Sequence, residues 1–146
     1  MDWNDAATLA RTLMNEHGLE LVPFQFNNRK RSAGTTFFQY GKVLRIELSR
    51  PVVDPNPLEL VRDTILHEIA HALVGHAAGH SWVWKLKARE IGANTERCCG
   101  DNIVTPPGKY QATCSCKIGV HHVHRMPKRR LVCRFTRLPL NFQKVR

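Results

Sequence analysis

Two histidines and a glutamate stand at a spacing that suits metal-dependent hydrolysis. The segment His67-Glu68-Ile69-Ala70-His71 places its two histidines four residues apart, and residues four apart lie on the same face of an α-helix. Both imidazoles can therefore bind one metal ion, while Glu68 lies close enough to act as general base on a water at that metal. The pattern predicts a zinc hydrolase with His67 and His71 as metal ligands.

A catalytic zinc ion needs a third protein ligand and one open position, and two histidines downstream are candidates. His76 follows His71 by only five residues, so it falls in the last turn of the predicted helix and points to another side. His80 comes after Gly79, and glycine allows the chain to turn back toward the metal. We therefore predict His80 as the third ligand, with His76 as the alternative.

An amphipathic helix must position the motif. Asn56, Pro57 and Glu59 are typical of an N-cap, a first helical position and a capping-box acid. Apolar residues then recur at helical spacing, at Leu58, Val61, Ile65, Ile69, Ala72 and Leu73. Because the motif residues lie largely off this stripe, we expect them to face away from the core. Gly75 and Gly79 indicate where the helix ends.

The chain before this helix predicts one further helix and three strands. Residues 6–17 have helical apolar spacing, whereas residues 21–27, 35–40 and 42–48 are rich in β-forming residues separated by glycines. We expect the strands to form a three-stranded antiparallel meander. A sheet edge beside the motif helix could hold an extended peptide by strand addition.

The motif and the residues after it resemble the SprT-like metalloprotease domain. His80 and Trp84 fall on that family's pattern, which continues from HExxH to a histidine and then to a tryptophan in the next helix. Ser81, which we expect to cap that helix, replaces the usual glycine. The resemblance covers residues 1–95 and implies an α+β fold with a zincin-like core. It also implies a zinc peptidase of the kind that degrades DNA-bound and DNA-crosslinked proteins.

The same resemblance, together with the cysteine and charge pattern, predicts the domain organisation. We expect a SprT-like metalloprotease core at residues 1–100, a linker at 101–109, and a small β-rich, zinc-ribbon-like tail at 110–146. Five cysteines at short spacings in an intracellular chain indicate thiols or metal ligands rather than disulfides. Cys98 and Cys99 are adjacent, which suits reduced thiols.

Three cysteines in the tail resemble the remains of the zinc ribbon that SprT-like proteins often carry. They are Cys114, Cys116 and Cys133. A closed structural site needs four ligands, yet Thr136 stands where a second Cys-x-x-Cys thiol would be. The fourth ligand of a second, structural zinc ion could come from a nearby histidine, with the candidates His121, His122 and His124. The alternative is a ribbon that folds without metal.

The positive charge is concentrated in the tail. Residues 1–108 contain twelve Lys/Arg and twelve Asp/Glu, whereas residues 109–146 contain ten Lys/Arg and no acid, so the tail carries the whole net charge of +10. This distribution predicts docking on nucleic acid, with DNA as the expected partner, mainly through phosphates. The residues that we expect to contribute are Arg125, Lys128, Arg129, Arg130, Arg134 and Arg137.

The N-terminus is polar and unlike a signal peptide, and no apolar stretch approaches the length of a membrane span. We therefore expect no membrane partner and an intracellular location, in the cytoplasm or with the nucleoid or nucleus, of a cell or of a virus-infected host.

These observations together predict a zinc-dependent endopeptidase acting on DNA-bound or DNA-crosslinked proteins, with Glu68 as general base. A nucleic-acid-binding module with a structural metal site is the first alternative, but such a site has no use for Glu68. A metal-dependent nuclease is the second, although three-histidine nucleases lack the glutamate after the first histidine. A regulatory protease that cleaves a repressor is the third, and that class usually takes an acidic third ligand.

Overall fold

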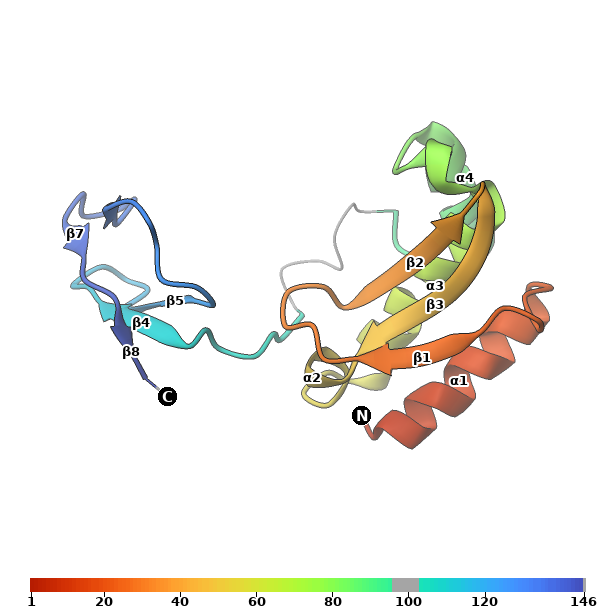
Figure 1. The fold of residues 1–146 in the computed structure, drawn as a ribbon, viewed down its shortest axis with the longest axis horizontal. Helices are drawn as coiled ribbons and strands as arrows, with labels where there is room; N and C mark the ends of the chain where they lie inside the picture. Colours follow the sequence, from red (N-terminus) through yellow and green to blue (C-terminus); the bar gives the residue numbers. More distant parts are fainter. Residues whose placement is uncertain (96–102, 146) are drawn as a thin grey trace. The chain divides into compact units, whose positions relative to one another are not determined.

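The structure, a computed structural model, describes residues 1–95 and 103–145 (Figure 1). The chain divides into two compact units, Met1–Thr105 and Pro106–Arg146. Helices and a sheet make up the first unit and short strands the second, so the chain is an α+β protein, as predicted. The expected end of the core at residue 100 lies outside the described residues, as do Cys98 and Cys99.

A three-stranded sheet forms one layer of the first unit (Figure 1). Its strands are β1 (Phe24–Asn27), β2 (Gly34–Gln39) and β3 (Lys42–Ser49), in the order β1-β3-β2. β3 is parallel to β1 and antiparallel to β2, so Ile46 lies opposite both Phe24 and Thr36. β3 is therefore the central strand, and β2 lies at an edge.

The predicted antiparallel meander is wrong in its strand pairing. Only β2 and β3 form a hairpin, through Tyr40 and Gly41, both of which have positive φ. The six residues 28–33 can span roughly 20 Å, whereas crossing two strand spacings takes only about 10 Å. The chain can thus pass from one edge of the sheet to the other. The last four residues of β3 are all buried, as its central position requires.

Helix α1 (Trp3–Glu16) packs on this sheet and on the motif helix. Asp2 caps it, since its carboxylate accepts a hydrogen bond of 2.7 Å from the backbone N–H of Asn4. Its buried residues recur at helical spacing, and they are Ala6, Ala10, Leu13 and Met14. All four belong to the main hydrophobic core.

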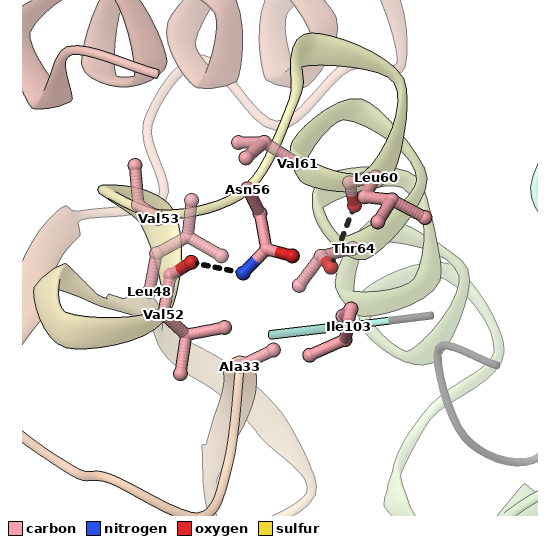
Figure 2. Close-up of a pocket in the computed structure, with 9 residues that line it drawn as sticks. All are labelled: Ala33, Leu48, Val52, Val53, Asn56, Leu60, Val61, Thr64 and Ile103. Carbon is pink, nitrogen blue, oxygen red and sulfur yellow. Dashed lines mark hydrogen bonds between the residues drawn. The ribbon is translucent and has the colours of Figure 1, made fainter. Parts of the chain in front are cut away.

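The motif helix, α3 (Leu58–Val74), begins differently from the prediction. Pro57 is its N-cap, and no side chain caps the helix. The amide of Asn56 instead donates to the carbonyl oxygens of Val52 (2.6 Å, Figure 2) and Val104 (2.7 Å), and it accepts from the N–H of Val104 (2.8 Å). A buried amide gains three hydrogen bonds there, against one at a cap.

The buried face of α3 is broader than the predicted apolar stripe. Its buried residues are Val61, Thr64, Ile65, Leu66, His67, Glu68, Ile69 and Ala70. Leu58 and Leu73, both predicted on the stripe, are exposed. His67 and Glu68 are buried because β2 and the helix after α3 cover this side, which corrects the expectation that the motif faces away from the core.

Short elements connect and complete the helical layer. They are α2 (Arg50–Val53) before α3, the 3₁₀ helix η1 (His76–Ala78) after it, and α4 (Trp82–Glu90). α3 ends at Gly75, as predicted, where φ is 85°. Ser81 takes the N-cap position of α4, whose Trp84 is fully buried in the core. None of the helices in the described residues combines the length and the apolar character needed to cross a membrane.

The second unit consists of short antiparallel strands. They are β4 (Tyr110–Thr113), β5 (Val120–Val123), β6 (Leu131–Val132), β7 (Pro139–Leu140) and β8 (Gln143–Lys144), arranged as β5-β4-β8 and β6-β7. A tight turn follows β4, where the N–H of Cys114 donates to Gly119 (2.8 Å), and another follows β6, where the N–H of Cys133 donates to Leu138 (2.9 Å). Cys114 and Cys116 therefore lie in the first turn, and Cys133 lies at the start of the second.

Candidate metal centre

Three imidazoles converge where α3 meets α4. Nε2 of His80 lies 3.0 Å from Nε2 of His67 and 3.1 Å from Nε2 of His71. His67 and His71 come from successive turns of α3. The chain returns His80 to them through Gly79, whose φ of 50° favours glycine. The structure thus brings together the three histidines that the sequence predicts as ligands.

The three ring nitrogens fit one zinc ion. Zn–N bonds of about 2.0–2.1 Å place tetrahedral ligand nitrogens roughly 3.3 Å apart, close to the separations here. Burial, together with repulsion from the neighbouring imidazoles, lowers the pKa of His67 to about 3 and that of His71 to about 4. Both rings are therefore neutral near pH 7, which is the form that binds metal. Three ligands leave one tetrahedral position for water or substrate.

Trp84 supports the imidazoles from the side of the core. Its side chain is fully buried, and its ring centroid lies 4.6 Å from that of His67, 5.2 Å from that of His71 and 4.7 Å from that of His80. Packing against one rigid indole restricts the rotation of all three rings. The ligands are therefore held in place by α4 as well as by α3.

Glu68 is positioned by strand β2. The hydroxyl oxygen of Thr36 lies 2.7 Å from Oε2 of Glu68 and 2.9 Å from its carbonyl oxygen. Gly34 leaves room for the carboxyl group, since a Cβ there would lie 2.7 Å from Cγ of Glu68. Burial raises the pKa of Glu68 to about 7, although hydrogen bonds with Thr36 oppose the rise. A carboxyl group that titrates near neutrality can both take up and return a proton.

Sequence reasoning missed Thr36 and Gly34. Gly34, Thr36 and Phe38 alternate along β2, and alternate residues of a strand share one face. This pattern is visible in the sequence. Which face meets α3 depends on how β2 packs on the helix, so the alternation alone could not pair either residue with Glu68.

His76, the alternative third ligand, lies outside the group of three. It begins η1 after the backbone has left helical geometry at Gly75, and its ring contacts Phe38 edge-on at 5.5 Å between centroids. It lines the same open hollow as Glu68 and the three grouped histidines, with a volume of about 380 Å³. The metal group therefore faces an open hollow bounded by β2 on one side and α3 on the other.

Comparison with known families identifies the first unit. The model of the SprT-like family matches residues 5–104, which run from α1 through α4. The chain belongs to the SprT-like family. Its resemblance to that family, predicted from the motif, is confirmed. SprT-like proteins are generally zinc metallopeptidases, so family and site agree on a metalloprotease-type function. Searches of curated proteins and of solved structures gave no match.

Beyond the part that matches the SprT-like family, a second group of metal-binding side chains lies between the two cysteine turns. Ligand atoms of Cys114, Cys116, Cys133 and His121 all lie within 4.8 Å of one another. Nε2 of His121 is 3.4 Å from Sγ of Cys116. Three thiols and one imidazole are a donor set that suits a structural zinc ion.

The pairing of strand β5 explains why His121, and neither His122 nor His124, belongs to this group. His121 pairs with Ala112 of β4, and alternation along the strand turns His122 to the opposite face. His124 follows the end of β5. Thr136, at the position of the fourth ribbon cysteine, places its hydroxyl oxygen 3.3 Å from Sγ of Cys114. It therefore contacts a group member, while His121 supplies the fourth ligand atom.

The predicted DNA-docking residues of this SprT-like protein all lie on the surface of the second unit. Arg125, Lys128, Arg129, Arg130, Arg134 and Arg137 are exposed, and they lie in the turns on either side of β6. Phe135 is also exposed, with the charged groups of Lys117 and Arg134 within 4.8 Å of its ring centroid. This surface combines cations with an aromatic ring.

Proposed function

We propose that this protein is a zinc-dependent endopeptidase with a zincin-like catalytic unit, acting on proteins that are bound or crosslinked to DNA. The convergence of His67, His71 and His80 beside the buried carboxyl group of Glu68 carries the proposal. Structural zinc sites are closed by four protein ligands, whereas three ligands and an adjacent base suit hydrolysis.

Each residue of the site has a role in peptide hydrolysis. A zinc ion held by the three histidines supplies a Lewis acid for the scissile carbonyl group and for the attacking water. Glu68 takes a proton from that water and delivers it to the leaving amine. Thr36 holds Oε2 of Glu68, which leaves Oε1 for proton transfer. The edge of β2 offers backbone groups that can hold an extended polypeptide beside the site.

The position of His76 argues against a purely structural metal site. A closed site would need a fourth ligand, and His76 is the nearest candidate by sequence. Its ring instead contacts Phe38 and stands outside the metal group. This placement supports an open fourth position, and therefore the hydrolase over the alternative of a nucleic-acid-binding module with a structural metal.

Charge supports DNA as the place where the peptidase acts. The second unit has many exposed cations and no acidic residue after position 108. A surface of this kind binds phosphates with an affinity that falls steeply as salt rises. Tethering to DNA raises the local concentration of proteins on the same DNA, so the catalytic unit itself can be unselective.

A second zinc ion would hold the two cysteine turns of the second unit together. A unit of about forty residues buries little apolar surface, and such small folds usually need metal or disulfides. Cys114, Cys116, Cys133 and His121 supply the four ligands that a closed site requires. We assign this zinc ion a structural role.

Proteolysis of a DNA-crosslinked protein tests the proposal. The zinc-loaded protein is incubated with a protein crosslinked to labelled DNA, with the same protein free of DNA, and with labelled RNA and DNA alone. We expect peptide fragments from the crosslinked protein, intact nucleic acid, and no cleavage by Glu68→Gln although it still binds zinc at the three histidines. Equal cleavage by Glu68→Gln overturns the peptidase assignment, and cut nucleic acid favours the nuclease.

A further inference from the structure

A second hollow adjoins the metal site at the far end of β2. Its volume is about 470 Å³, and its lining includes Phe38, Tyr40, Val74 and Ala77. Phe38 and His76 line this hollow as well as the hollow that contains the metal group. The two rings meet edge-on at an angle of 70°. The hollows are therefore neighbours, separated by one pair of rings.

The backbone builds the second hollow from two chain reversals. α3 stops at Gly75, whose φ of 85° turns the chain away from the helix axis. β2 stops at Tyr40 and Gly41, whose φ values of 49° and 76° suit the tight turn of the hairpin. One wall is thus the end of a helix and the other is the end of an edge strand.

Strand β2 runs from the metal site to this hollow, and its pairing with β3 shifts register between Phe37 and Phe38. Thr36 contacts Glu68, and Phe38, two residues further along, contacts His76. Two residues of strand advance the chain by roughly 6.6 Å. A polypeptide extended along the edge of β2, with its scissile bond at the metal site, would therefore place a side chain at the second hollow about two residues from that bond.

The lining indicates which side chain fits. Phe38, Tyr40, Val74 and Ala77 present aromatic and aliphatic groups, and the lining includes no carboxylate, lysine or arginine among the described residues. Tyr40 is 96% exposed, so its ring is available to cover a ligand. The volume exceeds that of any single side chain. An apolar side chain gains by leaving water there, whereas a charged one loses hydration and meets only the imidazole of His76 and the hydroxyl group of Tyr40 as polar side-chain groups.

We propose that this second hollow is a subsite that receives an apolar side chain of the polypeptide substrate, with Phe38 and His76 as the partition between subsite and metal site. The inference rests on the proposed peptidase function and adds a specificity that the metal group itself does not have. Binding would bury the exposed ring of Tyr40 and align the main chain of the substrate along β2.

A peptide series that varies one residue tests the subsite. Peptides carry Phe, Leu, Gly, Lys or Glu two residues before or after the cleaved bond and are otherwise identical. We expect kcat/KM to be about tenfold higher for Phe or Leu than for Gly on one of the two sides, in line with the usual effect of filling an apolar pocket. Equal values for all five residues on both sides overturn the proposal.

Two variants and a matched control locate the effect in this hollow. Phe38→Ala should bring the ratio of kcat/KM for the Phe and Leu peptides over the Gly peptide close to one, whatever its effect on the absolute rates. Ala77→Glu, which places a carboxylate in the lining, should shift the preference to Lys. Leu44→Ala removes a half-exposed apolar side chain from the neighbouring strand β3, outside both linings, and should change nothing. Unchanged selectivity in both lining variants overturns the assignment.

A binding measurement separates the subsite from the peptidase function. Zinc-loaded Glu68→Gln is titrated with the same peptides carrying a fluorescent label, and anisotropy reports binding without cleavage. Tighter binding of the Phe peptide than of the Gly peptide, lost in the Phe38→Ala double variant, supports the subsite even if the wild-type protein cuts no peptide. In that case the proposed peptidase function is wrong and the proposed subsite stands. Equal affinities for the two peptides contradict the subsite whatever the wild type cuts.

Discussion

Thr36 and Glu68 are joined through a single hydroxyl group. Its oxygen lies 2.7 Å from Oε2 of the Glu68 side chain and 2.9 Å from the carbonyl oxygen of the same residue. Strand β2 is therefore tied both to the backbone of α3 and to the carboxyl group that we assign as general base.

Loss of this hydroxyl should slow catalysis without weakening substrate binding. A hydrogen bond to a charged group contributes about 1.5–3 kcal/mol, so Thr36→Val should lower kcat by about 10- to 100-fold. KM and the zinc content should stay close to those of the wild type, and Thr36→Ser should recover most of the rate. Steady-state kinetics with one peptide decides this, and a Thr36→Val enzyme with normal kcat would refute it.

A methyl group at position 34 should displace the general base. The Cβ of an alanine there would lie 2.7 Å from Cγ and 2.8 Å from Oε1 of Glu68. Because the backbone of β2 is held by β3, the side chain of Glu68 has to move, and Gly34→Ala should lower kcat at least tenfold. Gly18→Ala is the comparison: its φ of 71° disfavours alanine, but no atom lies within 4 Å of a Cβ there, so it should lower stability without changing kcat. Equal kcat in the wild type and Gly34→Ala would exclude this role.

Those site residues that lie close together in the sequence could be predicted, whereas those brought together only by the packing of distant elements could not. His67, Glu68 and His71 are fixed by helical spacing, and His80 by a glycine turn nine residues later. Thr36 comes from a strand more than thirty residues away, and its contact depends on how β2 packs on α3. No local pattern encodes that packing.

The fold shows the same division. The helices, the strand segments and the end of α3 at Gly75 follow from periodicity and turn residues. The order β1-β3-β2 does not, because the residue pattern of β1 suits either neighbour. The local sequence around Asn56 predicts a helix cap, whereas two of its three hydrogen bonds are made with Val104, which is distant in sequence.

Acid should destabilise the metal-free first unit. The pKa values of His67 and His71 are about 3 and 4 in the folded chain, below about 6.5 when unfolded, so their stabilising contribution is complete above pH 6.5 and falls as pH decreases. The pKa of Glu68 is about 7 when folded against 4.5, so its contribution is complete below pH 4.5 and is lost as pH rises through 7. Between pH 4.5 and 6.5, these three groups together therefore take up about one proton net on unfolding, two at the histidines less one at Glu68.

Urea unfolding after chelation measures this dependence. Trp3, Trp82 and Trp84 all lie in the first unit, so tryptophan fluorescence reports on that unit alone. The free energy of unfolding should decrease from pH 6.5 to 4.5, and the slope should be about twice as steep in Glu68→Gln, which lacks the opposing group. Constant stability across this range would contradict the assignment of neutral histidines.

Of the three tail histidines, only His121 should be required for binding of the second zinc ion. His121→Ala should reduce the zinc content from two ions per chain to one, because it removes one of four ligands from a closed site. His122→Ala, on the opposite face of β5, should leave two ions. Metal analysis of the purified proteins tests this. Two ions in His121→Ala, or one in His122→Ala, would overturn the ligand assignment.

Removal of the Asn56 amide should destabilise the first unit. Asn56 is 2% exposed and makes three hydrogen bonds, one to Val52 and two to Val104. The cavity that remains beside it is only about 10 Å³ (Figure 2). At about 1 kcal/mol for each bond, Asn56→Ala should lower the free energy of unfolding by roughly 2–4 kcal/mol. Exchange of the Val104 amide hydrogen should quicken. Asp54→Ala, at an exposed neighbour, should have little effect on either quantity.

Because β3 pairs with both other strands, we expect its two pairings to form in a definite order during folding. Its hairpin with β2 closes through two residues, whereas its parallel pairing with β1 brings together Phe24 and Ile46, twenty-two residues apart. The shorter loop costs less entropy and closes first. Changes in the turn at Gly41 should then slow folding, while changes in β1 should mainly hasten unfolding. The strand that supports the general base is thus among the first to form.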